Sequence, residues 1–239
     1  MCIRDRPYGA WIGSPICQEF VNDNNTITFN NLVENAFRRV IELLNNKDIN
    51  VSGWEDVLLV HGEDGQNSID INRNFDGINF TPYVWNNYWG GGREDMVYKF
   101  ANLGYNVIMS NSSAFYFDMV DDKDLDNIGL SWSGYANYKD MWTVDVFDIF
   151  NDSYGVRKNN ISKEYIESSE KLKSSNRNNI VGIQSQIWSE TIRNEDILDY
   201  MFMPNIIGFS QTAWSKEPKW RSIQNQLERE MTLNIEWNK

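Results

Sequence analysis

Short apolar runs alternate with helical patterns along most of this chain, and that alternation constrains the fold more than any other feature. The runs lead into Trp54, cover Phe80–Trp85 and Tyr105–Ser110, and extend over Ile180–Trp188. Runs of roughly four to eight apolar and aromatic residues are typical of β-strands. Strands that are each followed by a helix predict an α/β fold with a parallel sheet.

Four segments are predicted to be helices, namely Leu32–Asn45, Arg93–Leu103, Lys163–Ser174 and Asn194–Trp214. Asn31 and Glu34 have the spacing of a capping box at the start of the first helix. Gly104 marks the end of the second, and Pro204, which has no backbone N–H, interrupts the last.

Two polar stretches stand between these elements. His61–Gly77 is polar and punctuated by glycine, which predicts an inserted loop in which His61 is solvated. Asp121–Asn160 is too long for a simple turn, so we expect it to be either functional or an excursion from the fold.

Aromatic residues stand at the ends of the four predicted strands, at Trp54, Trp85, Tyr116 and Trp188. Carboxylates accompany two of them, because Asp118 and Glu190 each come two residues after an aromatic residue. An aromatic plane can receive the apolar face of a sugar ring while a carboxylate accepts hydrogen bonds from its hydroxyls. The repetition predicts a carbohydrate pocket at one edge of the sheet.

A parallel β/α barrel has its active site at the C-terminal ends of its strands, where these aromatic residues fall. Such a barrel needs eight strands and about 250 residues, whereas this chain of 239 residues shows four. The sequence therefore predicts the C-terminal half of a (β/α)8 TIM barrel, about strands 5–8 with their helices.

Composition limits the partners. A net charge of −12 argues against binding of nucleic acid or of an anionic membrane surface. The single His61 excludes a multi-histidine metal site, and two cysteines are too few for a disulfide scaffold. No stretch approaches the about 20 apolar residues of a membrane span. Met1–Arg6 lacks the apolar core of a signal peptide, and we interpret it as a non-native scar before residues 7–239.

Several motifs, taken together and in order, resemble the family-20 glycoside hydrolases, which are β-N-acetylhexosaminidases and bacterial chitobiases. The matching pieces are Pro7-Tyr-Gly-Ala-Trp11 with Ser14-Pro15-Ile-Cys17, Gly53-Trp54-Glu-Asp, Val84-Trp85-Asn-Asn, Asn111-Ser-Ser-Ala-Phe-Tyr116-Phe-Asp118, Gly129-Leu-Ser-Trp132 and Gln186-Ile-Trp188-Ser-Glu190-Thr191. They span nearly the whole chain, which makes the resemblance far more specific than any single motif.

The resemblance implies exo-acting hydrolysis of N-acetylglucosamine-terminated, chitobiose-like oligosaccharides, in which the substrate's own 2-acetamido oxygen attacks the anomeric carbon. It implies no metal or organic cofactor, and family members are commonly exported. The family's acid and its polarising aspartate belong to a His-x-Gly-x-Asp-Glu motif just before Pro7, and that motif is missing from this chain. Asp5 falls near the expected acid without the supporting context, so it receives no role.

The resemblance also assigns roles to residues of this chain. Trp54, Trp85 and Trp188 would enclose the acetamido methyl group, and Trp132 would line the pocket or the aglycone side. Tyr116 would be catalytic, because its hydroxyl would donate to the acetamido oxygen. Two carboxylates would accept hydrogen bonds from the O4 and O6 hydroxyls of the terminal sugar: Asp118 and Glu190.

Simpler interpretations stay open for the residues taken singly. A tryptophan at a strand end is more often a core residue than a ligand wall, although four at one rim favour the wall. Tyr116 and Asp118 could instead cap local elements. For the whole chain the alternative is a non-catalytic carbohydrate-binding relative that kept the pocket, and an Asp-Glu pair upstream of Pro7 would distinguish the two functions.

Overall fold

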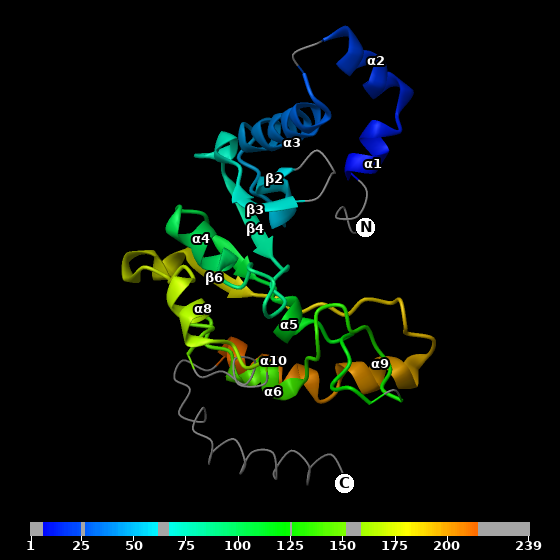
Figure 1. Ribbon diagram of the computed structural model, residues 1–239, viewed down its shortest axis with the longest axis vertical. Coiled ribbons are helices and arrows are strands. Elements are labelled where there is room, and N and C mark those ends of the chain that lie inside the picture. Colours follow the sequence, from blue (N-terminus) through cyan, green and yellow to red (C-terminus); the bar gives the residue numbers. More distant parts are fainter. Residues whose placement is uncertain (1–6, 25–26, 62–66, 125, 152–158, 215–239) are drawn as a thin grey trace.

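A computed structural model describes residues 7–24, 27–61, 67–124, 126–151 and 159–214 (Figure 1). The helices are α1 (Pro7–Ile12), α2 (Pro15–Asp23), α3 (Phe29–Asn45), α4 (Met96–Asn102), α5 (Ser112–Phe115), α6 (Tyr138–Thr143), α8 (Lys163–Ser168), α9 (Glu195–Phe202) and α10 (Asn205–Trp214). The strands are β1 (Val51–Trp54), β2 (Leu59–His61), β3 (Asn67–Ile71), β4 (Phe80–Val84), β5 (Val107–Met109) and β6 (Ile180–Ile183). Short 3-10 helices are η2 (Glu55–Leu58), η3 (Arg73–Phe75) and η4 (Ser174–Asn179).

Four strands form one sheet in the order β1-β4-β5-β6, and every neighbouring pair is parallel. The prediction of a parallel sheet is therefore confirmed. The strands are shorter than predicted, because β4 ends at Val84, β5 at Met109 and β6 at Ile183. The aromatic residues of interest thus lie just beyond three of the strands, in the connections that leave the sheet.

Helix α3 begins earlier than predicted, at Phe29, and its N-cap is Thr28. The capping box is formed by Thr28 and Asn31, each of which accepts a hydrogen bond from the backbone N–H of the other. The predicted pairing of Asn31 with Glu34 is wrong. The Glu34 carboxylate instead accepts hydrogen bonds at 2.8 Å from the side chains of Asn72 and Asn74, which ties α3 to the segment after β3.

The prediction of an inserted loop at His61–Gly77 is also wrong for its described part. β2 and β3 pair antiparallel, His61 belongs to β2 and is partly buried, and η3 follows. Phe75 explains why this segment is part of the fold. Its side chain is only 1% exposed, and its carbonyl accepts a hydrogen bond from the hydroxyl of Tyr105 at 3.0 Å. The mostly polar composition of the segment predicted a loop, although Phe75 is buried in the core.

The other predicted helices are present with different bounds. α4 covers only Met96–Asn102. The side chain of Asp95, directly before it, accepts a hydrogen bond from the backbone N–H of Glu170 at 2.7 Å. α8 ends at Ser168, residues 169–173 are not helical, and η4 begins only at Ser174, the last residue of the predicted segment. The interruption at Pro204 is confirmed, since it separates α9 from α10.

The long connection Asp121–Asn160 includes α6, which packs on α10 in the lower part of Figure 1. A Cβ atom at Gly208 would lie 2.5 Å from the carbonyl oxygen of Tyr138, so the two helices approach as closely as glycine allows. Thr212 also donates its hydroxyl to the carbonyl of Met141 at 2.7 Å. The connection is therefore part of the fold.

The main core lies between the sheet and its helices and includes Val84, Phe100, Val107, Met109 and Phe115. A second, smaller core at the ends of the strands contains four of the predicted site residues, Trp54, Trp85, Tyr116 and Trp188. No helix among the described residues has both the length and the apolar character needed to cross a membrane.

Candidate active site

The parallel sheet brings the aromatic residues to one edge. Trp54 is the last residue of β1, and Trp85 directly follows β4. Tyr116 comes after β5 and the short helix α5, while Trp188 lies in the extended segment after β6. Because all four strands run in the same direction, their C-terminal ends meet on the same side of the sheet.

Five aromatic side chains contact one another at this edge, and we call them the aromatic cluster: Trp54, Trp85, Tyr116, Trp132 and Trp188. The ring centroids of Trp188 lie 6.3 Å from Trp54 and 6.2 Å from Tyr116. Those of Trp132 lie 5.7 Å from Trp85 and 5.9 Å from Tyr116, both edge to face. The structure therefore joins every aromatic residue that the sequence assigned to the pocket.

Backbone hydrogen bonds hold Tyr116 beside the segment that follows β6. The N–H of Phe117 donates to the carbonyl of Gln186 at 2.8 Å, and the N–H of Gln186 donates to Phe115 at 3.1 Å. The Gln186 side chain is buried and donates to the Ser110 hydroxyl at 3.4 Å. These bonds continue the β5–β6 pairing beyond the strands and thereby fix the spacing of Tyr116 and Trp188.

Trp132 reaches the cluster from the long connection. Its loop packs on the chain after Tyr116, since the N–H of Leu130 donates to the carbonyl of Asp118 at 2.8 Å. A Cβ atom at Gly129, where φ is +151°, would lie 2.8 Å from that same carbonyl oxygen. The hydroxyls of Ser112 and Ser133 are 2.7 Å apart and buried. Trp132 itself is 42% exposed, so it forms the outer wall of the cluster.

Asp118 is completely buried, yet neither of its carboxylate oxygens makes a hydrogen bond of normal geometry to a protein group in the described chain. Burial, opposed by hydrogen bonding from the backbone amides of Asp118 and Trp188 and aided slightly by the charge of Glu190, raises its pKa to about 6. A buried carboxylate whose hydrogen bonds are this weak is costly, and it can accept further hydrogen bonds from a bound molecule.

Glu190 lies beyond Trp188 and is exposed to solvent. It is close enough to Asp118 for its charge to raise the Asp118 pKa, so both carboxylates act on the same end of the sheet. The sequence places Trp188 and Glu190 two residues apart, and the structure puts one in the aromatic cluster and the other at its solvent side.

Two acidic residues beside the aromatic cluster, Glu55 and Asp56, were not predicted to belong to the site. Glu55 is 1% exposed and accepts hydrogen bonds from the backbone N–H groups of Trp85 at 3.2 Å and Asn86 at 3.1 Å. Asp56 accepts from the indole Nε1 of Trp85 at 2.7 Å. Burial first, and then the charge of Asp56, raise the pKa of Glu55 well above its ordinary value. Their position directly after Trp54 is the sequence feature that could have identified them as site residues.

The model of the family described as Glycosyl hydrolase family 20, catalytic domain, matches residues 6–217. The chain belongs to this family. Among curated relatives, a β-hexosaminidase of Vibrio vulnificus is 26% identical over 215 residues, which cover 89% of this chain and 24% of the relative. An N,N'-diacetylchitobiase of Vibrio harveyi is 26% identical over 224 residues, covering 89% and 22%. The chain thus spans about a quarter of the length of these relatives.

Solved structures of family-20 enzymes share the fold. An exo β-N-acetylglucosaminidase of Vibrio harveyi, determined with N-acetylglucosamine, is 20% identical with a TM-score of 0.60, and the match covers 97% of this chain and 30% of that one. A β-N-acetylhexosaminidase of Bacteroides fragilis is 15% identical with a TM-score of 0.60, covering 97% and 39%. The four parallel strands are therefore part of a (β/α)8 barrel, as predicted.

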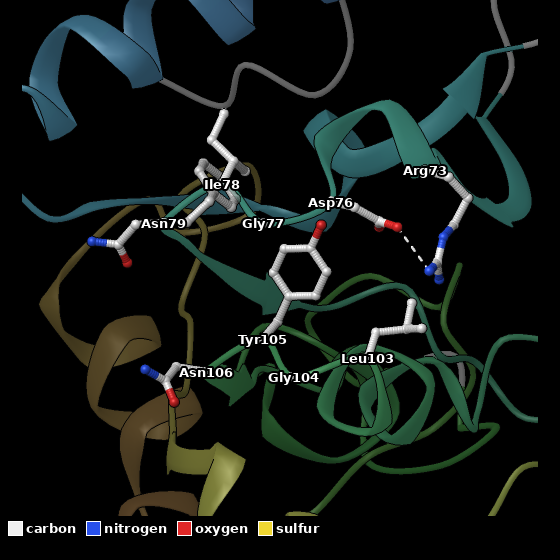
Figure 2. A pocket seen from close by; sticks show the side chains of 10 residues that line it. Arg73, Asp76, Gly77, Ile78, Asn79, Leu103, Gly104, Tyr105 and Asn106 are labelled. Carbon is white, nitrogen blue, oxygen red and sulfur yellow. Dashed lines mark ion pairs between the residues drawn. The ribbon is translucent and has the colours of Figure 1, made fainter.

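A polar cavity of about 330 Å³ lies at the N-terminal ends of the strands, opposite the aromatic cluster (Figure 2). Its lining comes from the residues just before β4 and β5, including Ile78, Asn79, Tyr105 and Asn106. In Figure 2, Arg73 and Asp76 form an ion pair at its rim, with a distance of 2.7 Å. The aromatic cluster is formed by the other ends of these strands, so this cavity is separate from the candidate site.

The described residues contain no cluster of three or more His, Cys, Asp and Glu side chains that could hold a metal ion. His61, the chain's one histidine, lies in β2.

Proposed function

We propose that this chain is the C-terminal part of the catalytic barrel of an exo-acting β-N-acetylhexosaminidase. The buried carboxylate of Asp118 carries the proposal, because it lies at the edge of an aromatic cluster, has no hydrogen bond of normal geometry among the described residues, and can accept from sugar hydroxyls. The names of the curated relatives, a β-hexosaminidase and a diacetylchitobiase, support the substrate class. The substrate is a terminal N-acetylglucosamine of a chitobiose-like oligosaccharide.

In the proposed complex the 2-acetamido arm of that sugar lies among Trp54, Trp85 and Trp188. Their apolar rings surround the methyl group and exclude water, which holds the acetamido oxygen below the anomeric carbon. The oxygen then attacks that carbon and the glycosidic bond breaks, so that a cyclic oxazolinium intermediate forms and water later opens it. Retention of the anomeric configuration follows from these two displacements.

Tyr116 supports the charge that develops on the acetamido group. Its side chain is 2% exposed and its ring contacts both Trp132 and Trp188, so few other positions are open to its hydroxyl. A hydroxyl fixed in this way donates to the acetamido oxygen without reorganisation during the reaction. The proposed role of Tyr116 is therefore catalytic.

Asp118 and Glu190 bind the hydroxyls on the other side of the sugar ring. The oxygens of Asp118 lack a hydrogen bond of normal geometry among the described residues, and ionised carboxylates are strong acceptors for the O4 and O6 hydroxyls. Trp132, which is exposed on its outer side, faces the leaving sugar. An aromatic surface at that point favours a second sugar in the aglycone position.

The general acid and the polarising aspartate are proposed to precede this chain in the complete protein. The alternative is a non-catalytic sugar-binding relative, which would keep the same aromatic cluster without the acid. Sequencing the gene upstream of Pro7 and measuring release of aryl alcohol from an aryl N-acetylglucosaminide by the complete protein separates the two. Hydrolysis together with an upstream Asp-Glu pair is expected, whereas binding without hydrolysis would favour the alternative.

A further inference from the structure

Glu55 and Asp56 occupy the turn where β1 leaves the sheet. β1 pairs with β4 only as far as Trp54 and Tyr83, and the chain then turns into η2. On the other side of β4 the pairing continues, since Ser110 and Ser112 donate their N–H groups to the carbonyls of Val84 and Trp85 at 2.8 and 2.9 Å. The residues after β4 therefore have no strand partner on the β1 side, but they keep one on the β5 side.

The Glu55 carboxylate takes the place of that missing strand. Its two oxygens accept from two consecutive backbone N–H groups, those of Trp85 and Asn86, at 3.2 and 3.1 Å. Buried backbone donors without partners are costly, and a carboxylate that bridges two of them fixes the chain direction at Trp85. The side chain of Glu55 is 1% exposed, so water does not compete for these bonds.

Asp56 acts on the same residue through its side chain. Its Oδ2 accepts from the indole Nε1 of Trp85 at 2.7 Å, the length of a strong charge-assisted hydrogen bond. The Trp85 ring contacts Trp132 at 5.7 Å between centroids and is 3% exposed. A ring that is bonded at its nitrogen and packed against a neighbouring ring is held in one orientation.

We infer that Glu55 and Asp56 are positioning residues that set Trp85 as a wall of the acetamido pocket, Glu55 through the backbone and Asp56 through the indole nitrogen. The inference rests on the proposed function, because only there does the orientation of Trp85 affect the reaction. A rotated Trp85 would leave the acetamido arm room to turn away from the anomeric carbon. The effect should appear in the chemical step more than in binding of the sugar.

Adjacent carboxylates also repel each other, and Asp56 raises the pKa of Glu55. A turn that needed only a cap would be served by one acidic residue. Two neighbouring acids directed at the backbone and the side chain of one tryptophan indicate that the orientation of this tryptophan matters.

The test uses the complete protein and compares Asp56→Ala with Asp56→Asn. Asp56→Ala removes the acceptor of the indole bond, and we expect kcat to fall about tenfold with a smaller change in KM. Asp56→Asn keeps an acceptor oxygen and should stay within about threefold of wild type. Glu167→Gln, which removes an exposed carboxylate from α8, is the matched control and should equal wild type.

A double-mutant cycle with Trp85→Phe shows whether Asp56 acts through the indole nitrogen. Trp85→Phe keeps an aromatic ring and removes Nε1, so adding Asp56→Ala to it should change kcat by less than about twofold. Independent, multiplying effects would overturn the inference, as would wild-type kinetics of Asp56→Ala or an Asp56→Asn variant as impaired as Asp56→Ala.

The indole ¹⁵N–¹H resonance of Trp85 separates this inference from the proposed function. It should move upfield in Asp56→Ala and stay in place in Glu167→Gln. An inactive wild type would overturn the proposed function and the catalytic consequence together, while the resonance would still show the indole bond. An active wild type whose Trp85 resonance and kcat ignore Asp56→Ala would overturn the inference alone.

Discussion

The two ends of the parallel sheet differ in what their polar groups lack. At the N-terminal ends, the charged and phenolic groups that line a cavity of about 330 Å³ have protein partners, namely in the Arg73–Asp76 ion pair and in the bond from the Tyr105 hydroxyl to the carbonyl of Phe75. At the C-terminal ends, the completely buried Asp118 has no hydrogen bond of normal geometry among the described residues. Unsatisfied buried polarity, which costs stability, indicates a binding site better than open volume does.

The largest effect should come from separating this chain from the rest of its barrel. In the described sheet β1 and β6 each have one free edge, and Val40 and Val181 are both 54% exposed. We expect the 239-residue chain alone to associate and to release no aryl alcohol from an aryl N-acetylglucosaminide. Size-exclusion chromatography and a hydrolysis assay measure both properties.

The control is the complete protein, together with a version in which the upstream acidic pair is changed to the corresponding amides. The complete protein should be soluble and active, and its amide version should be soluble and inactive. A monomeric, active 239-residue chain would show that the catalytic residues lie within it and would refute the proposed division of the barrel.

Tyrosine-to-phenylalanine changes at the two ends should act on different properties. Tyr116→Phe in the complete protein should lower kcat on the order of 10²-fold with a smaller change in KM, because the hydroxyl serves the developing charge. Tyr105→Phe removes the bond to Phe75 and should cost about 1 kcal/mol of unfolding free energy with kcat unchanged. Steady-state kinetics and thermal unfolding measure the pair; an unaltered kcat in Tyr116→Phe would remove that residue from the mechanism.

Charge removal should also distinguish the two ends. Glu190→Gln should weaken binding of a thiazoline-type inhibitor by about 1.5–3 kcal/mol, since a charged acceptor for a sugar hydroxyl is replaced. Trp188→Ala should cost at least as much, in part through lost packing against Trp54 and Tyr116. Asp76→Asn breaks the ion pair with Arg73 and should leave the affinity unchanged. Calorimetry measures the affinity of each variant for the inhibitor. Equal losses of affinity in Asp76→Asn and Glu190→Gln would mean that the C-terminal ends of the strands do not form the sugar-binding site.

The sequence predicted the parts of the fold that depend on local periodicity. The four parallel strands, the break at Pro204 and the alternation of strands with helices follow from apolar spacing and proline chemistry. The hairpin of β2 and β3 was missed because its polar residues hide one buried side chain, Phe75. The start of α3 was misplaced because Thr28 and Asn31 form the capping box, while Glu34, to which the box was assigned, bonds distant asparagines that local spacing cannot show.

The composition of the aromatic cluster could be predicted, but its internal contacts could not. Parallel strands bring their C-terminal ends together, so the strand-end aromatic residues were expected as neighbours. Trp132 could be assigned to the site only from the family resemblance. Its loop is held at the site by bonds to Asp118 and Ser112, which local sequence patterns do not predict. The bonds from Trp85 to Glu55 and Asp56 depend on where β1 turns away from β4, which no local pattern specifies.

A pH dependence of the free energy of unfolding should belong to Asp118. Its pKa in the folded chain is about 6, above the about 3.9 of an unfolded aspartate, because burial disfavours the charge. Between these values the folded state binds more protons than the unfolded state, so the free energy of unfolding falls as pH rises through 6. Asp118→Asn cannot ionise and should lack this contribution. The difference in stability, wild type minus Asp118→Asn, should therefore decrease from pH 4 to pH 7 by on the order of 1–2 kcal/mol. Denaturant unfolding of the complete protein at both pH values measures it, with Asp76→Asn at the opposite end as the exposed control. A difference that is constant with pH would mean that Asp118 is as well solvated or paired as the acids at the other end of the sheet.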